Sequence, residues 1–258
     1  MILDKIVNEK KIEVESEKRL INIDTLIKKC ELAPPPLNFS KAITKSNDIS
    51  IIAEVKKASP SKGLIREDFD HIAIANEYME SNVQAMSVLT EKNFFQGSKQ
   101  IFTEIRKISN LPMLRKDFII DEWQIYEART MGADAVLLIA AILPLETLKR
   151  FYEITKSLGM SALVETHNAE ELYIALECDC DIIGINNRNL DTFEEDLSTT
   201  ERLIMQIPKG KITISESAIR QSSDMDLMRS FGVDGVLVGE MFMRQHSVEK
   251  AVRELRGY

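Results

Sequence analysis

Proton-donating and proton-accepting side chains stand at the ends of several short apolar runs in this 258-residue chain. Six polar residues share this placement: Glu54, Lys56, Lys116, Glu165, Asn186 and Arg188. If the runs are parallel strands of one barrel, their carboxyl ends meet at one mouth, where such barrels concentrate catalysis. Because side chains alternate along a strand, Glu54 and Lys56 face the same side as Ile52.

These residue types suggest acid–base chemistry. A dehydrated lysine beside other cations has a lowered pKa, and a glutamate shielded from water has a raised one. Such a set can donate and accept protons near neutral pH. The alternative for each residue is a structural ion pair or a solvated surface charge.

The histidines and cysteines do not suggest a metal site. The three histidines are dispersed, and we expect ordinary surface or helix-capping residues at His71, His167 and His246. The cysteines are odd in number and lack paired CxxC spacing, which predicts reduced structural thiols at Cys30, Cys178 and Cys180. We therefore expect neither a metal nor a cofactor.

A repeated pattern predicts the elements that position these side chains. Residues 132–138 (GADAVLL) and 232–238 (GVDGVLV) share Gly-x-Asp-x-Val-Leu at a distance of 100 residues. Each is an apolar run after a helix-ending glycine, typical of a buried parallel strand. Further runs complete eight predicted strands: 49–55, 85–89, 111–114, 161–165, 181–185 and 212–215. Amphipathic stretches between them predict helices, for example at 69–81 and 145–157.

The alternation predicts an α/β fold, a single (βα)8 TIM barrel over residues 49–258. An open doubly wound sheet is the alternative, but it predicts a glycine-rich first turn, and no GxGxxG follows the first strand. Residues 1–48 precede the barrel. Helical periodicity over 2–30 and the prolines at 34–36 predict an N-terminal helical cap and a stiff linker within the same domain. A solvated leader helix is the alternative.

Charge and hydropathy restrict the partners. The net charge is −8 and the pI about 5.2, with lysines and arginines spread among acids, which argues against a nucleic-acid surface. No run approaches the roughly 20 apolar residues of a membrane span, and the N-terminus does not resemble a signal peptide. We expect a cytoplasmic protein whose partner is neither nucleic acid nor membrane.

The loops after the seventh and eighth predicted strands are a candidate phosphate site, as in many barrels. Ser217 offers a hydroxyl there, and Gly239 allows close approach to the backbone. The alternative for Ser217 is the N-cap of the next helix, and both roles can coexist.

The sequence resembles the indole-3-glycerol-phosphate synthase family of tryptophan biosynthesis. Residues 54–63 (EVKKASPSKG) are similar to the family signature ExKxxSPSxG. Later blocks also match along nearly the whole chain, at 114–118, 163–167, 185–190 and 237–240. One block departs from the family pattern, because Ala218 stands where Gly is usual. Alanine adds a methyl group where a phosphate approaches and adopts positive φ at a cost.

The resemblance implies ring closure of 1-(2-carboxyphenylamino)-1-deoxyribulose 5-phosphate with loss of carbon dioxide and water. It implies Lys116 as general acid, Lys56 as its support, Glu165 as the residue that removes a proton, and Glu54 and Asn186 as orienting residues. The implied substrate-binding residues are Ser59, Phe118, Arg188, Leu190, Ser217, Ala218, Gly239 and Glu240. The implied partner is a small phosphorylated substrate, and we expect a monomer or a weak homodimer.

Three other functions stay open from the residues. A lysine at a strand end can be the nucleophile of a Schiff-base aldolase. Glu54 and Glu165 could serve as acid and base of an Amadori isomerase, although the lysines would then be superfluous. A phosphate-binding barrel without turnover is the third, and it would have to keep costly unpaired buried charge.

Overall fold

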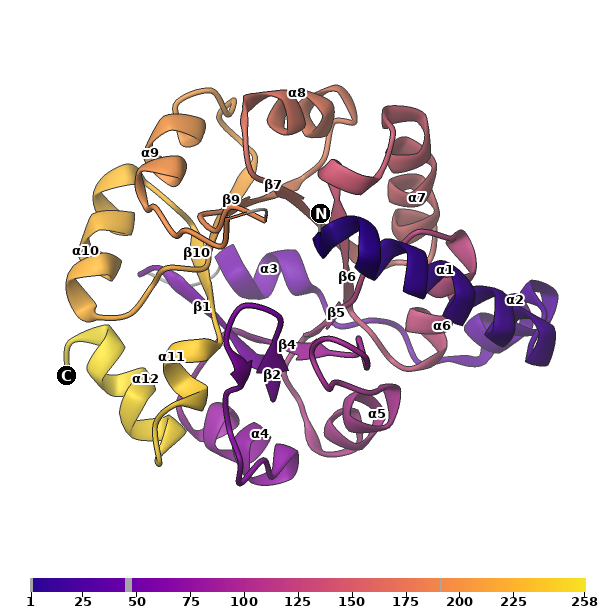
Figure 1. The fold of residues 1–258 in the computed structure, drawn as a ribbon, viewed down its shortest axis with the longest axis horizontal. Coiled ribbons are helices and arrows are strands. Elements are labelled where there is room, and N and C mark those ends of the chain that lie inside the picture. The colour runs from indigo at the N-terminus through magenta and orange to yellow at the C-terminus, as the bar shows by residue number, and fades with distance from the viewer. Residues whose placement is uncertain (1, 45–47, 191) are drawn as a thin grey trace.

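The computed structural model describes residues 2–44, 48–190 and 192–258. Eight parallel strands close into a barrel in the order β1-β10-β9-β8-β7-β6-β5-β4 (Figure 1). Their bounds are β1 (Ser50–Val55), β4 (Ala85–Leu89), β5 (Met113–Lys116), β6 (Ala135–Ile139), β7 (Ser161–Thr166), β8 (Ile182–Asn186), β9 (Ile212–Glu216) and β10 (Gly235–Val238). Pairing of β1 with both β4 and β10 closes the ring, so the TIM barrel is confirmed and the open sheet is excluded.

Helices surround the barrel and connect its strands. They are α4 (His71–Glu80), α5 (Lys99–Ile108), α6 (Glu122–Thr130), α7 (Leu145–Ser157), α8 (Ala169–Glu177), α9 (Ser198–Ile204), α10 (Ser222–Phe231), α11 (Glu240–Met243) and α12 (Val248–Arg256), with a short 3-10 turn η1 (Ala140–Ile142). The predicted helix at 145–157 coincides with α7. The one predicted from residue 69 begins at His71, because Asp70 caps it by accepting from the N–H groups of Ile72 and Ala73.

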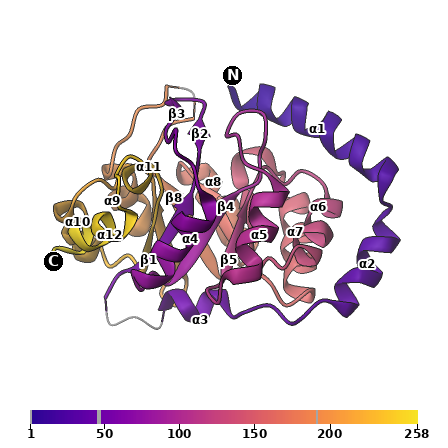
Figure 2. The same ribbon diagram turned by 90° about the horizontal axis from the view of Figure 1, so that it is seen from below.

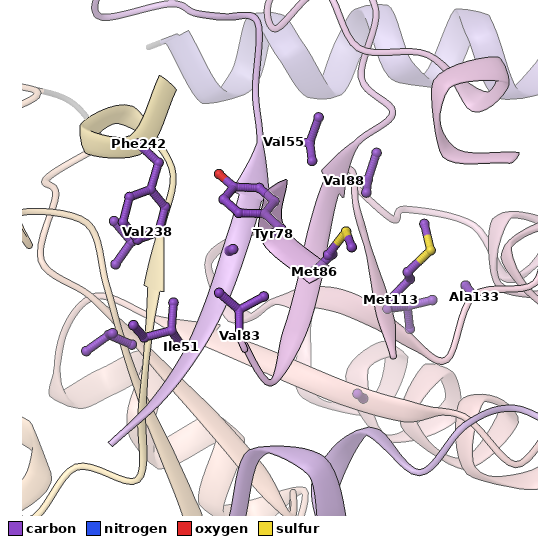
Figure 3. Packing of buried hydrophobic residues seen from close by; sticks show 14 of the residues in the cluster. Ile51, Val55, Tyr78, Val83, Met86, Val88, Met113, Ala133, Val238 and Phe242 are labelled. Atoms are coloured by element: carbon purple, nitrogen blue, oxygen red, sulfur yellow. The ribbon is translucent and has the colours of Figure 1, made fainter. Parts of the chain in front are cut away.

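Two apolar cores follow the alternation of side chains along the strands. The outer core lies between strands and helices and includes Ile51, Met86 and Phe242 (Figure 3). The inner core fills the barrel and includes Ile52 and Leu114. Residues at even positions of β1 therefore face inward, as expected for Glu54.

The N-terminal segment forms three helices, α1 (Ile2–Leu20), α2 (Ile23–Leu32) and α3 (Phe39–Thr44). The stretch predicted as helical over 2–30 is interrupted at Asn22, whose side chain caps α2 by accepting from the N–H of Thr25. Figure 2 shows α1 at the same end of the barrel as the small hairpin of β2 (Ala58–Ser59) and β3 (Gly63–Leu64), with α3 at the opposite end.

Helix α3 closes the amino end of the barrel (Figure 2) and is not predicted from the sequence pattern. Phe39 and Ile43 are fully buried in the inner core, and the hydroxyl of Ser50 donates to the carbonyl of Ile43 at 2.6 Å. A six-residue helix is unstable alone, whereas burying each of these side chains contributes about 1.5–3 kcal/mol. The helix therefore depends on the barrel it fills. Among the described residues, none of the helices is long and apolar enough to span a membrane.

Candidate active site

The carboxyl ends of β1, β5 and β7 bring four of the predicted charged residues together. Lys116 Nζ lies 3.1 Å from Glu165 Oε2, and Lys56 Nζ lies 2.6 Å from Glu54 Oε2. The side chains of all four are at most 15% exposed. They line a cavity of about 460 Å³ at the barrel mouth, together with Asn186. Proton donors and acceptors from separate strands thus line one cavity.

Glu216 at the end of β9 is a fifth charged residue, which the sequence analysis missed. Its Oε2 lies 2.5 Å from Lys116 Nζ, and its side chain is only 2% exposed. The sequence does contain a signal for Glu216, which directly follows the predicted strand at 212–215. In the same way, Asn186 directly follows the predicted strand at 181–185, and Lys116 lies two residues after the one at 111–114. The neighbouring Ser217 and Ala218 favour a phosphate loop there, which drew attention away from the carboxylate.

Burial and neighbouring charges determine the pKa values in this cluster. Burial alone would lower the pKa of Lys116, but Glu216 and Glu165 raise it well above its usual range. Burial raises the pKa of Glu216 to about 7, against the opposing effect of Lys116. Burial also acts to raise the pKa of Glu165, but Lys116 and His167 hold it well below its usual range.

Two of the expectations about pKa are therefore wrong. A lowered pKa was expected for a lysine beside other cations, but carboxylates surround Lys116 and favour its charged form. A raised pKa was expected for shielded glutamates, which holds for Glu216 and fails for Glu165. Glu54 resembles Glu165, since Lys56 and Lys116 outweigh its burial and lower its pKa.

His167 is not the surface or capping residue that we expected. Its side chain is 10% exposed and lies between Glu165 and Glu171. Asn168 is the cap of α8 instead, accepting from the N–H of Glu171. Within the described parts of the chain, no group of three or more His, Cys, Asp or Glu residues is arranged to hold a metal ion.

Most of the predicted substrate-binding residues also line the cavity: Phe118, Arg188, Leu190, Ser217, Ala218, Gly239 and Glu240. Ser59 does not, because it is buried in β2, with its hydroxyl 3.4 Å from that of Ser61. Arg188 is bonded to Glu195 and lies 3.4 Å from Glu240, which also pairs with Arg244.

The backbone after β9 is strained where the family pattern has glycine. Ser217 and Ala218 both have φ of +65°, in the left-handed region. That conformation costs an L-residue about 1–2 kcal/mol. Helix α10 begins at Ser222 with Gln221 as its N-cap, so the alternative of Ser217 as N-cap is wrong.

The N-terminal helix α1 contributes to this site. Ile2, Leu3 and Ile6 line the cavity, and Lys10 is buried with its Nζ 2.9 Å from Asp117 Oδ1. Asp117 directly follows Lys116, so α1 is ion-paired to the strand end that carries the central lysine. A solvated leader helix would make none of these contacts.

A closed (βα)8 barrel with half-buried lysines and buried glutamates at its carboxyl mouth places the chain among the TIM-barrel proteins whose mouth carries proton donors and acceptors. The sequence model of the family described as indole-3-glycerol phosphate synthase matches residues 3–255. The chain therefore belongs to the indole-3-glycerol phosphate synthase family, whose members are carboxy-lyases of tryptophan biosynthesis.

Curated relatives agree with this assignment. The indole-3-glycerol phosphate synthase of Acetivibrio thermocellus is 51% identical over 258 residues, covering 99% of each chain. That of Thermoanaerobacter pseudethanolicus is 51% identical over 244 residues, covering 95% of this chain and 93% of the relative. The family resemblance is confirmed, and the aldolase, isomerase and non-catalytic alternatives are set aside.

Solved structures support the fold alone. A 3-hexulose-6-phosphate synthase from Salmonella typhimurium superposes with a TM-score of 0.65 at 12% identity, covering 80% of this chain and 96% of that one.

Proposed function

We propose that this chain closes the indole ring of 1-(2-carboxyphenylamino)-1-deoxyribulose 5-phosphate, with Lys116 as the general acid. The observation that carries the proposal is the position of Lys116 Nζ, half-buried at the cavity wall and bonded to Glu165 and Glu216. The aromatic carbon must attack the substrate ketone, and the ketone oxygen gains negative charge as it does so. A fixed ammonium in a site shielded from water stabilises that charge and donates the proton.

The carboxylates supply the later proton transfers. Loss of water after ring closure requires a proton acceptor, and Glu165 is ionised because Lys116 and His167 outweigh its burial and depress its pKa. Glu216, with a pKa of about 7, can hold or release a proton beside Lys116 near neutral pH. Glu54 and Asn186 orient the lysines and the substrate.

Decarboxylation depends on the surroundings of the substrate carboxylate. Lys56 faces that carboxylate while paired with Glu54. Phe118 and Leu190 form an apolar part of the cavity wall next to the substrate carboxylate and flank the aromatic ring of the substrate. An apolar setting stabilises a carboxylate less than water does, which favours loss of carbon dioxide.

The remaining cavity residues bind the anionic end of the substrate. Backbone N–H groups of residues 217, 218, 239 and 240 surround the phosphate, with Arg188 beside them. Ser59 lies within the β2–β3 hairpin, whose residues 60–62 line the cavity. This arrangement requires no basic patch, in keeping with the net charge of −8. We extend the proposal to a cytoplasmic monomer or weak homodimer, which sedimentation at micromolar concentration tests.

The N-terminal segment covers the mouth in this proposal, since Ile2, Leu3 and Ile6 line the cavity. A chain beginning after Pro36 retains α3 but loses this wall, and we expect its KM to rise. Wild-type substrate affinity in that variant would refute the covering role.

Lys116→Ala tests the central claim. We expect it to lose most of kcat and keep its fold, followed by the fluorescence of the indole product and by circular dichroism. Lys156→Ala is a matched control, because it removes a lysine that is ion-paired at 2.7 Å to Asp181 but does not line the cavity. Activity of Lys116→Ala within about tenfold of wild type, or about 1.4 kcal/mol of barrier, would show that Lys116 is not the principal acid.

A further inference from the structure

His167 lies in the two-residue connection between β7 and α8, with a carboxylate on each side of its ring. Nδ1 is 2.8 Å from Glu171 Oε2, and Nε2 is 3.3 Å from Glu165 Oε1. A neutral imidazole carries one N–H and can donate to only one of two carboxylates. Nδ1 is hydrogen-bonded to Glu171, whereas Nε2 is buried with no hydrogen-bond partner among the described residues and lies within ion-pair distance of Glu165. A proton on each nitrogen would place the positive charge of an imidazolium between the two carboxylates, so this arrangement favours the charged ring.

The outer carboxylate of this arrangement is held firmly. Glu171 Oε2 also accepts from the backbone N–H of His167 at 2.8 Å, and Oε1 accepts from Asn168 Nδ2 at 2.7 Å. Glu171 stands in the first turn of α8, where the helix dipole favours a negative charge. The ring of His167 is therefore braced from the side away from the cavity.

The inner carboxylate is the proposed base. Glu165 Oε1 faces the imidazole, and Oε2 faces Lys116 Nζ at 3.1 Å. The strands that flank β7, namely β6 and β8, carry no titratable side chain, and neither does η1. Among the described residues, the charged groups paired with the ring are Glu165 and Glu171, with Lys116 and Glu216 beyond Glu165.

We propose that His167, as an imidazolium braced by Glu171, is a positioning residue that fixes and keeps ionised the carboxylate of Glu165 for the reaction. This inference rests on the proposed function, in which Glu165 accepts a proton. Burial acts to lower the pKa of His167, but Glu165 and Glu171 raise it to about 10, so the ring keeps its charge at neutral pH. Without the positive charge of His167, Glu165 keeps its ion pair with Lys116, which is also paired with Glu216. The pKa of Glu165 then rises, so its carboxylate takes up a proton at a higher pH.

The wild-type protein allows a direct test, because the chain has only three histidines. Imidazole NMR spectra recorded between pH 5 and 10, with resonances assigned from His71→Gln and His246→Gln, follow each ring separately. We expect His167 to keep both ring protons at pH 8.5 and to lose one more readily in Glu165→Gln. Titration of His167 near the ordinary pKa of about 6.5 would overturn the inference. This measurement is made on wild-type His167, so it does not depend on whether a His167 variant folds.

Kinetics test the consequence for catalysis. His167→Asn removes both the charge and the contact with Glu165, and we expect kcat to fall at least about tenfold with little change in KM. The acidic limb of the kcat–pH profile should move to higher pH, because Glu165 loses a stabilising cation. His167→Gln can still donate a hydrogen bond to Glu165 and should recover part of kcat at alkaline pH.

The matched control is His71→Asn, which removes a histidine that pairs with Glu104 at 2.7 Å away from the cavity. It should leave kcat and its pH profile unchanged. A profile of His167→Asn that coincides with wild type overturns the inference, even if kcat falls, since a structural role alone would not move the limb. Glu165→Gln separates the two claims: if it stays fully active, the proposed function of Glu165 fails, whereas an inactive Glu165→Gln beside an unaltered His167→Asn overturns only the inference.

Discussion

Gly184 on β8 packs against the carboxylate of Glu216, which occupies the space that a Cβ at position 184 would need. A methyl group built on Gly184 stands 2.3 Å from Glu216 Oε1, whereas ordinary contact begins near 3.4 Å. In Gly184→Ala, Glu216 must therefore withdraw by about 1 Å. The same carboxylate holds Lys116 Nζ at 2.5 Å through its other oxygen, so the substitution displaces the central ion pair without removing any charge.

The expected loss follows from that displacement. Misplacing a reacting group by about 1 Å costs up to about 100-fold in rate, or about 2.7 kcal/mol of barrier. We expect the loss mainly in kcat, measured from the fluorescence of the indole product under substrate saturation. The three atoms nearest to the added Cβ belong to Glu216 and Leu163, neither of which is a proposed phosphate-binding residue, so KM should change little.

Gly235→Ala is the matched control. Its Cβ would lie 2.8 Å from Ile214 Cδ1 and 3.2 Å from the carbonyl oxygen of Ser50, at the amino end of the barrel. Overpacking there costs about 1–3 kcal/mol of stability but touches no cavity residue. If folded Gly184→Ala kept kcat within threefold of Gly235→Ala, the position of Glu216 would not control Lys116, and the reasoning would be refuted.

Three further predictions concern stability, each measured by urea unfolding. Ala218→Gly should be up to about 1 kcal/mol more stable, because release of the left-handed strain at +65° exceeds the added backbone entropy; a less stable variant would contradict this. Lys10→Met should lose about 3–5 kcal/mol, because it leaves Asp117 buried without one cation; a loss under 1 kcal/mol would argue against the pair. The folded protein holds a proton on Glu216 up to about pH 7 that the unfolded chain releases near pH 4.5, so this group's contribution to stability declines as pH rises between these values. Glu216→Gln should remove that decline, at most about 1.4 kcal/mol per pH unit, and parallel curves for both proteins would contradict it.

Local patterns made the barrel predictable. Each strand is a continuous apolar run because it is buried on both faces, and each helix has a periodic apolar stripe. The charged residues at strand ends were recognisable because a parallel barrel brings those ends to one mouth. Glu216 could have been found by the same rule, but its neighbours Ser217 and Ala218 suggested a phosphate loop.

The sequence by itself determined the eight strands, the family and the lysines and glutamates of the mouth, since these depend on residue type and spacing along the chain. Only the tertiary structure decided that α3 fills the amino end, that His167 lies between two carboxylates, and that the pKa of Lys116 is raised. Each of these depends on what surrounds a residue in space. Burial and Coulomb interaction fall off with distance between atoms, and the residues that close around Lys116 are separated by up to 100 positions in the chain.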